Sequence, residues 1–342
     1  MKRIKNLIIV FTLLLLVNNV FAGGGNRTGT GGASQLLIPV GARGISMGGS
    51  NIASSSGVEA LFWNPAGVAR INGSAAVTFS HMNYIADIGV EYGAVAANFQ
   101  SFGVLSLSLK TLSIGDIPVT TTTDPDGTGK TFSPQFLTAG LTYSKQLTDQ
   151  VAVGLTTNLI SETMDQVSAT NIAFNVGLTY DNLASLKGLS FGIVLKNLGP
   201  KMQYDGSGML IQADATDLQR PPSYYKVDSA PFELPTTFEL GFSYKPYIDQ
   251  MNSLLVAGTF QNNNFSSDEY KVGLEYGFNN LFFIRTGYDF SPQAPKDEYI
   301  YGFTAGVGIN YELEGLDVKI DYAYRNVKYF DANHIFQISL GF

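Results

Sequence analysis

The sequence lacks cysteine, has only two histidines and carries little charge. Charged residues make up 14% of its 342 positions. A chain without cysteine forms no disulfide, no thiolate metal site and no lipoprotein anchor on an acylated cysteine. The spacing of His81 and His334 does not match a metal-binding pattern either. The sequence therefore predicts no metal and no cofactor.

Long apolar runs are also missing after the N-terminus, so no transmembrane helix is expected there. A basic start at Lys2 leads into the apolar stretch Leu7–Val17, and Ala22 supplies the small residue that a signal peptidase requires. This stretch is too short for a spanning helix, which needs about 20 residues. We predict that residues 1–22 are a cleaved signal peptide, and the alternative is a retained anchor.

Positive charge is scarce. Of the 21 Lys and Arg, three fall within residues 1–22, so 18 remain against 28 Asp and Glu. Nucleic-acid phosphates require clustered Lys and Arg. This balance argues against a nucleic-acid partner.

Catalytic motifs are almost absent. Residues 124–131 end in Gly-Lys-Thr, as a phosphate-binding loop does, but Asp124 stands where that loop needs its first glycine. The two histidines do not form a Ser-His-Asp order, although a closed barrel would bring their strands together. We predict no catalytic residue, and a histidine-assisted lipid hydrolase is the enzymatic alternative.

What the sequence does have is an alternation of apolar and polar residues from position 74 onward, the period of a β-strand. Leu105, Leu107 and Leu109 point one way, while Ser108 and Lys110 point the other. Val318 and Ile320 alternate with their neighbours in the same manner. The pattern predicts fourteen strands, at 75–84, 90–99, 103–111, 135–146, 151–161, 172–180, 189–197, 236–245, 253–261, 267–276, 281–289, 299–311, 316–325 and 334–342.

The connections and the strand ends favour a membrane barrel over a soluble sandwich. Short turns alternate with longer connections, predicted at 112–134, 162–171, 198–235, 290–298 and 326–333. Each even-numbered strand ends on an outward-facing aromatic residue; these are Phe99, Tyr143, Tyr180, Tyr244, Tyr276, Tyr311 and Phe342. Such aromatic girdles lie at the headgroup level of transmembrane barrels. We predict an all-β fold, in which residues 74–342 form a fourteen-stranded antiparallel transmembrane β-barrel in the outer membrane of a Gram-negative bacterium, surrounded by its lipid.

The inward face of the predicted strands carries charges of both signs. These lumen charges are Lys110, Glu239, Lys271, Glu275, Arg285, Asp289, Asp317, Lys319 and Asp321. We interpret them as residues that pair with one another, because a buried charge is costly unless it is paired. The alternative is that they line a substrate path.

The last strand has an apolar outward row that ends at the C-terminus. It consists of Phe336, Ile338, Leu340 and Phe342. In outer-membrane proteins generally, the barrel assembly machinery recognises the terminal aromatic residue. We predict that this row is the insertion signal and that this machinery is a partner.

Residues 23–73 differ in kind, because period two is missing from 34–73 and small residues dominate. Asn64 followed by Pro65 can cap and start a short helix. Non-strand backbone at membrane depth is tolerated only where protein surrounds it. We predict a hatch inside the lumen, with Arg43 paired to an inward carboxylate from the set Glu239, Glu275 and Asp321. A periplasmic extension is the alternative.

Two motifs in this segment resemble a known family. Gly41-Ala-Arg-x-x-x-Met-Gly-Gly49 and Trp63-Asn-Pro-Ala-Gly67 look like the opening of the PorV/PorQ family, which is related to FadL-type fatty-acid transporters. PorV proteins typically have Lys-Tyr after Asn-Pro-Ala, where Gly67-Val68 stands here. The resemblance implies a fourteen-stranded barrel and assigns these hatch residues: Arg43, Gly44, Met47, Gly48, Gly49, Trp63, Asn64, Pro65, Ala66 and Gly67.

Two functions follow from the resemblance. PorV itself serves the type IX secretion system and receives secreted proteins by their C-terminal sorting domains. A FadL-like protein instead passes small hydrophobic molecules. The 198–235 connection, with Tyr204, Met209 and Tyr224, suits either a protein docking site or an entry site for an apolar molecule. We favour protein handling on the resemblance alone.

Overall fold

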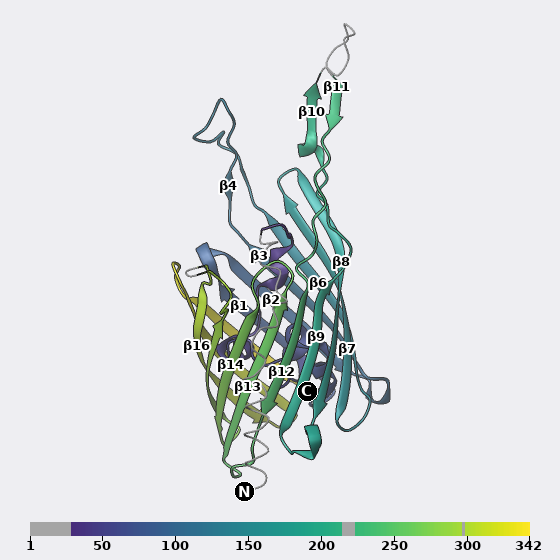
Figure 1. The fold of residues 1–342 in the computed structure, drawn as a ribbon, viewed down its shortest axis with the longest axis vertical. Coiled ribbons are helices and arrows are strands. Elements are labelled where there is room, and N and C mark those ends of the chain that lie inside the picture. Colours follow the sequence, from purple (N-terminus) through teal and green to yellow (C-terminus); the bar gives the residue numbers. More distant parts are fainter. Residues whose placement is uncertain (1–28, 214–222, 296–297) are drawn as a thin grey trace.

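Fourteen antiparallel strands close into one barrel in the computed structural model (Figure 1), which describes residues 29–213, 223–295 and 298–342. The predicted fold class is confirmed, while the predicted signal peptide lies outside the described residues. The barrel strands are β1 (Ala75–Asn83), β2 (Gly89–Asn98), β3 (Val104–Ser113), β6 (Gln135–Gln146), β7 (Val151–Met164), β8 (Val167–Asp181), β9 (Leu189–Leu198), β12 (Thr237–Tyr244), β13 (Asn252–Asn263), β14 (Glu269–Phe278), β15 (Phe282–Phe290), β16 (Tyr301–Leu313), β17 (Leu316–Val327) and β18 (Asn333–Gly341).

The strand period places apolar side chains on the outer face and polar ones in the lumen. On β3, Leu107 and Leu109 are 58% and 49% exposed, whereas Ser106 and Lys110 are 3% and 5% exposed. An outward apolar residue meets lipid, where it avoids the cost of contact with water. The predicted orientation of this strand is therefore the observed one.

The barrel closes between its first and last strands. β1 and β18 are antiparallel, with Ala76 opposite Gly341 and Asn83 opposite His334. The Phe342 carbonyl accepts a hydrogen bond of 2.6 Å from the Ser74 amide. The insertion row faces outward, with Phe336, Ile338 and Phe342 exposed and Leu340 half-buried.

The two ends of the barrel differ. At one end, which we call the turn end, short connections join the strands and Phe342 lies beside Ser74. At the other, the loop end, two hairpins project beyond the barrel (Figure 1). One is β4 (Ile117–Pro118) with β5 (Thr131–Phe132), and the other is β10 (Leu210–Ala213) with β11 (Ser223–Lys226).

The predicted long connection at 162–171 is wrong. β7 continues to Met164 and β8 begins at Val167, so only Asp165 and Gln166 join them. The outer-face residues at the start of β8, Ser168 and Thr170, are polar. The alternation is therefore lost, although the strand hydrogen bonds persist.

Residues 34–71, which we call the inner segment, lie inside the barrel (Figure 1). Met47 and Ile52 are fully buried. Its short helical elements are η2 (Ser34–Leu37), α2 (Ala42–Ser46), η3 (Gly57–Glu59), α3 (Ala60–Trp63) and η4 (Pro65–Arg70). Further short elements lie in the connections: η5 (Ile85–Asp87), η6 (Gln100–Phe102), η7 (Leu183–Ser185) and η8 (Ser207–Met209). Within the described residues, no helix is long and apolar enough to cross a membrane.

Candidate functional site

The inner segment runs along a row of glycines on the lumen wall. A Cβ atom built on any of them would lie under 3.0 Å from an atom of the inner segment, which is closer than packing permits. We call this row the glycine track; it consists of Gly154, Gly177, Gly192, Gly241, Gly273, Gly287 and Gly306, on seven different strands. Glycine at these positions lets the inner segment approach the wall backbone directly.

Asn64 fixes the second half of the inner segment. Its fully buried side chain accepts a hydrogen bond of 3.1 Å from the Ala66 amide and so caps η4. Its Nδ2 donates to the Ile52 carbonyl at 2.9 Å and to the Leu178 carbonyl of β8 at 3.2 Å. The Pro65 carbonyl accepts a further hydrogen bond from Ser144 on β6, at 2.6 Å. The short helix expected after Asn64 is present as a 3₁₀ helix.

Gly67 marks the departure from the typical PorV motif. A Cβ atom here would clash with the Ser55 carbonyl and with the Ala60 side chain. No larger residue fits without moving the backbone of the inner segment. A lysine at position 67 would therefore not fit this packing.

An ion-pair cluster fixes the first half of the inner segment. Arg43 of α2 donates to both carboxylate oxygens of Glu275, at 2.8 and 3.0 Å, and lies 3.6 Å from Glu59. Arg285 donates to the same Glu275 at 2.6 Å and to Asp321 at 2.5 Å. We call these five residues the charge cluster. Of the three carboxylates expected to accept from Arg43, Glu275 is the one that does.

The remaining residues of the first motif pack α2 between α3 and the wall. Gly44 and Gly49 lie against the Trp63 ring, where a side chain on Gly44 would overlap the indole. Gly48 follows Met47 with a positive φ of 65°, a conformation that favours glycine, and its backbone passes next to Tyr288. These contacts orient Arg43 toward the β14–β17 wall.

The other lumen charges find partners in several ways. Glu239 pairs with Lys196 at 2.9 Å, and Lys271 pairs with Glu269 at 3.0 Å. Lys110 is bound by backbone carbonyls rather than by a carboxylate: its Nζ donates to those of Gln35 and Ile38, at 2.7 and 3.2 Å. Asp289 lies 3.6 Å from Arg325. Asp317 and Lys319 are half-buried in a groove at the turn end.

Several charged residues of the lumen were not singled out by sequence reasoning, among them Glu59, Lys196, Glu269 and Arg325. Lys196 and Arg325 fall on inward positions of predicted strands, so the alternation alone could have identified them. Glu59 lies in the irregular inner segment, where no period assigns a direction.

An internal cavity of about 270 Å³ lies above the inner segment, toward the loop end. Its floor is apolar and includes Leu36, Ile45 and Trp63 of the inner segment. Its walls come from β9 and β12–β17 and carry the charged pairs described above. Phe62 lies at its edge between two lysines, 5.1 Å from Lys110 Nζ and 5.0 Å from Lys196 Nζ.

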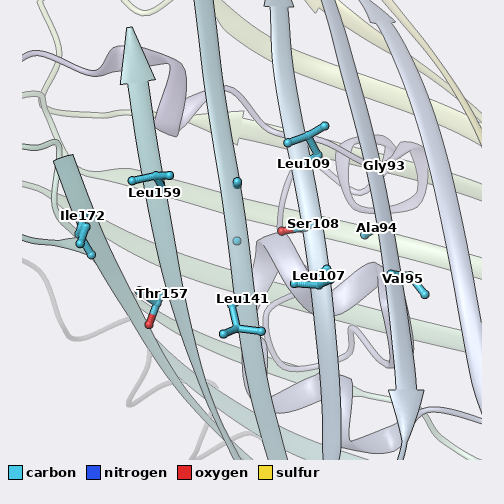
Figure 2. Close-up of a pocket in the computed structure, with 12 residues that line it drawn as sticks. Gly93, Ala94, Val95, Leu107, Ser108, Leu109, Leu141, Thr157, Leu159 and Ile172 are labelled. Carbon is cyan, nitrogen blue, oxygen red and sulfur yellow. The ribbon is translucent and has the colours of Figure 1, made fainter. Parts of the chain in front are cut away.

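A second hollow lies on the outer, lipid-facing wall. Figure 2 shows Leu107, Leu141, Leu159 and Ile172 on the neighbouring strands that line it. Its volume is about 700 Å³, and the lining is almost entirely apolar. Such a surface is compatible with lipid chains and offers no polar group for chemistry.

The two histidines lie on the outer face near the loop end. His81 Nδ1 lies 2.5 Å from a Glu91 carboxylate oxygen, and His334 Nδ1 lies 2.8 Å from the Tyr322 hydroxyl. Barrel closure brings their strands together as expected, yet each ring has its own partner. Among the described residues, no group of three or more His, Asp or Glu is arranged to hold a metal ion.

Comparison with known proteins agrees with this architecture. The chain is similar in structure to the CymD monoaromatic hydrocarbon channel (14% identity, TM-score 0.54, covering 93% of this chain and 99% of that one). It is also similar to the toluene transporter TbuX of Ralstonia pickettii (12% identity, TM-score 0.56, 90% and 99%) and to a FadL homologue of Pseudomonas aeruginosa (13% identity, TM-score 0.51, 89% and 98%). At these identities the likeness concerns the fold alone. No curated protein sequence matches the chain significantly.

The family model described as type IX secretion system protein PorV matches residues 22–219, which is more than half of the chain. This match confirms the resemblance inferred from the two N-terminal motifs. The matched family is that of a secretion-system protein rather than an enzyme class. The chain therefore belongs to the PorV family.

Proposed function

We propose that this protein handles secreted proteins at the surface of a Gram-negative outer membrane, and that it receives them by their C-terminal sorting domains. The observation that carries the proposal is the β10–β11 hairpin at the loop end. Leu210 and Tyr224, 47% and 72% exposed, share one face of this two-stranded ribbon, and Ile211 and Tyr225, 50% and 39% exposed, share the other. Exposed apolar and aromatic side chains that project together are typical of a protein docking surface.

The base of the hairpin is held in place. The Ser168 amide of β8 donates to the Asp205 carbonyl at 2.8 Å, and the Asp205 amide donates back at 2.9 Å. Lys226 pairs with the Asp205 carboxylate at 2.7 Å. An isolated two-stranded hairpin is marginally stable in water, so a partner that covers the ribbon would stabilise it.

The filled lumen supports the same proposal. The glycine track and the charge cluster bind the inner segment along most of its length, and moving it would leave buried charges unpaired. A fixed inner segment suits a scaffold better than a channel that must open.

Site-specific photo-crosslinking in the native bacterium tests this function. The variant Tyr224→p-benzoylphenylalanine should crosslink to secreted proteins. Tyr247, 84% exposed at the turn end, provides the matched control position. Equal crosslinking from both positions, or none to any secreted protein from Tyr224, would contradict the proposal.

A FadL-like channel for small hydrophobic molecules is the second candidate. The specific observation in its favour is the cavity at the loop end with its apolar floor. Toluene uptake by proteoliposomes that contain the intact barrel tests it. Uptake above that of protein-free liposomes would favour the channel.

A further inference from the structure

The β10–β11 hairpin is a sheet of two strands, and within the described residues no third strand pairs with either of them. The hairpin stands clear of the barrel at the loop end (Figure 1). Each of its strands therefore has one outer edge at which the backbone N–H and C=O groups lack a strand partner. Such an edge is a template for pairing with a strand of another chain.

The register identifies the residues that direct their backbone groups outward from β10. The Val227 amide donates to the Met209 carbonyl at 2.9 Å, so these two residues form a hydrogen-bonded pair of the ladder. Hydrogen-bonded and non-hydrogen-bonded pairs alternate between antiparallel strands, so the next hydrogen-bonded residue of β10 is Ile211. Leu210 and Gln212 consequently turn their N–H and C=O groups away from β11. These two residues form the outer edge of β10.

The other three strands of the two projecting hairpins carry or adjoin a residue that discourages strand pairing. β4 contains Pro118, which has no N–H to donate, β5 directly follows Lys130, and β11 has Lys226 on its outer edge. Proline and lysine at an edge are common means by which proteins prevent edge-to-edge association. Leu210 and Gln212 on the outer edge of β10 provide no such protection.

The side chains beside this edge are apolar on both faces of the ribbon. Leu210 and Tyr224 are exposed on one face, and Ile211 and Tyr225 are exposed on the other. Because successive side chains of a strand point to opposite faces, a strand added to β10 would meet an apolar neighbour on each face. The edge therefore fits a strand that is apolar on both faces better than one that alternates with polar residues.

We propose that the outer edge of β10 binds an extended, largely apolar strand of the secreted protein by strand addition. The inference rests on the proposed function and specifies how the sorting domain is held: the backbone groups of Leu210 and Gln212 bond to those of the added strand. The ribbon thereby becomes a three-stranded sheet, which is more stable than a two-stranded one. Main-chain recognition of this kind tolerates different side chains, which suits a protein that receives several secreted proteins.

Amide hydrogen exchange of the unmodified barrel in nanodiscs tests the proposal. The probe is the secreted protein that crosslinks to the Tyr224→p-benzoylphenylalanine variant. When the probe saturates the barrel, exchange at Leu210 and Gln212 should slow at least about tenfold, while exchange at Tyr224 on the β11 edge should stay the same. Binding of the probe without protection at Leu210 and Gln212 would overturn strand addition and leave the proposed function standing. Protection of both amides before the probe is added would also overturn it, because the edge would then be covered by this chain or by a second copy.

Gln212→Pro and Gln212→Ala form a matched pair of variants. Both remove the same side chain, but only proline removes the outward N–H, and an edge strand tolerates proline where its nitrogen faces solvent. Gln212→Pro should weaken binding of the same probe by about tenfold, and Gln212→Ala by less than about twofold. Equal affinities of the two variants would overturn the proposal.

Two further outcomes are distinguishable from these. If Gln212→Pro does not form the ribbon, the exchange measurement on the unmodified barrel decides the proposal. If no secreted protein crosslinks at Tyr224, the proposed function fails and strand addition fails with it.

Discussion

The two halves of the inner segment are bound to the barrel by different kinds of contact. The α2 half is held by the charge cluster, where Arg43 and Arg285 share Glu275. The η4 half is held chiefly by uncharged groups, above all the Asn64 amide and the backbone that it contacts on β8. Its one charged contact among the described residues is the partly exposed pair of Arg70 with Asp181, at 2.7 Å. A buried ion pair is intolerant of the loss of one partner, whereas a neutral contact depends on the fit of small side chains.

This difference has a counterpart on the wall. The strands that face η4 carry small hydroxyl side chains such as Thr142, Ser144 and Thr156, which are nearly inaccessible to solvent. The strands that face α2 carry Glu275, Arg285 and Asp321 instead. Glycines occur on both sides, because the backbone of the inner segment approaches both. The barrel wall is thus lined by small hydroxyl side chains next to η4 and by charged side chains next to α2.

Removing both halves should have the largest effect. A fourteen-stranded barrel has a lumen that strand side chains alone do not fill. A variant that lacks residues 34–73 should therefore conduct ions in a planar bilayer, while the intact protein should be nearly silent. Assembly of the variant is checked by heat-modifiable migration in gels. A large steady conductance from the intact protein would contradict the prediction that the inner segment acts as a hatch.

Breaking the charged half comes next. Glu275→Ala leaves Arg43 and Arg285 without their shared carboxylate, and it should lower the free energy of unfolding by about 3–5 kcal/mol. Urea unfolding in lipid vesicles measures this. Glu312→Ala, at an exposed position on β16, is the matched control. Similar losses from the two variants would mean that the cluster contributes little to stability.

A substitution on the outer face tests the barrel wall independently of the inner segment. Leu107 faces lipid and is 58% exposed. Leu107→Arg should cost about 2–4 kcal/mol if the residue lies near the bilayer midplane. Ser113→Arg, at the loop end of the same strand, should be tolerated. The yield of assembled protein decides it, and equal yields would contradict the assigned position of β3 in the membrane.

Disrupting the η4 half should lower the free energy of unfolding less than disrupting the charge cluster does. Asn64→Ala removes the cap of η4 and leaves the Ile52 carbonyl and the Ala66 amide without a partner, at about 1–3 kcal/mol. Asn72→Ala, at an exposed position just after the segment, is the control. Both are compared with Glu275→Ala in the same urea assay. A loss from Asn64→Ala as large as that from Glu275→Ala would remove the distinction between the two halves.

The sequence predicted the wall of the barrel better than its contents. Period two gives each strand residue a direction, so Leu107 and Lys110 could be assigned to opposite faces. The partner of Arg43 could be narrowed only to three carboxylates, because the choice among Glu239, Glu275 and Asp321 depends on the register between strands far apart in the chain. The glycine track could not be predicted from the sequence for the same reason. Its residues look like ordinary strand glycines until the inner segment lies against them.

The smallest effect is expected at the loop end, outside the lumen, where the Asp205–Lys226 pair joins the β10–β11 hairpin to its base. The hydrogen bond from Lys226, followed by that from the Gly206 amide, lowers the pKa of Asp205 below its usual value of 3.8. A lowered carboxyl pKa means that the pair stabilises the hairpin above the unfolded-state pKa, and that this contribution is lost as the pH falls through the folded-state pKa. The Gly206 amide donates to the Asp205 carboxylate at 2.6 Å, so its NMR shift reports the titration. In Lys226→Gln the midpoint should move up toward the ordinary value, while Lys201→Gln, which removes an exposed lysine elsewhere on this connection, should leave it unchanged. An unchanged midpoint in Lys226→Gln would show that the ion pair does not hold the hairpin in solution.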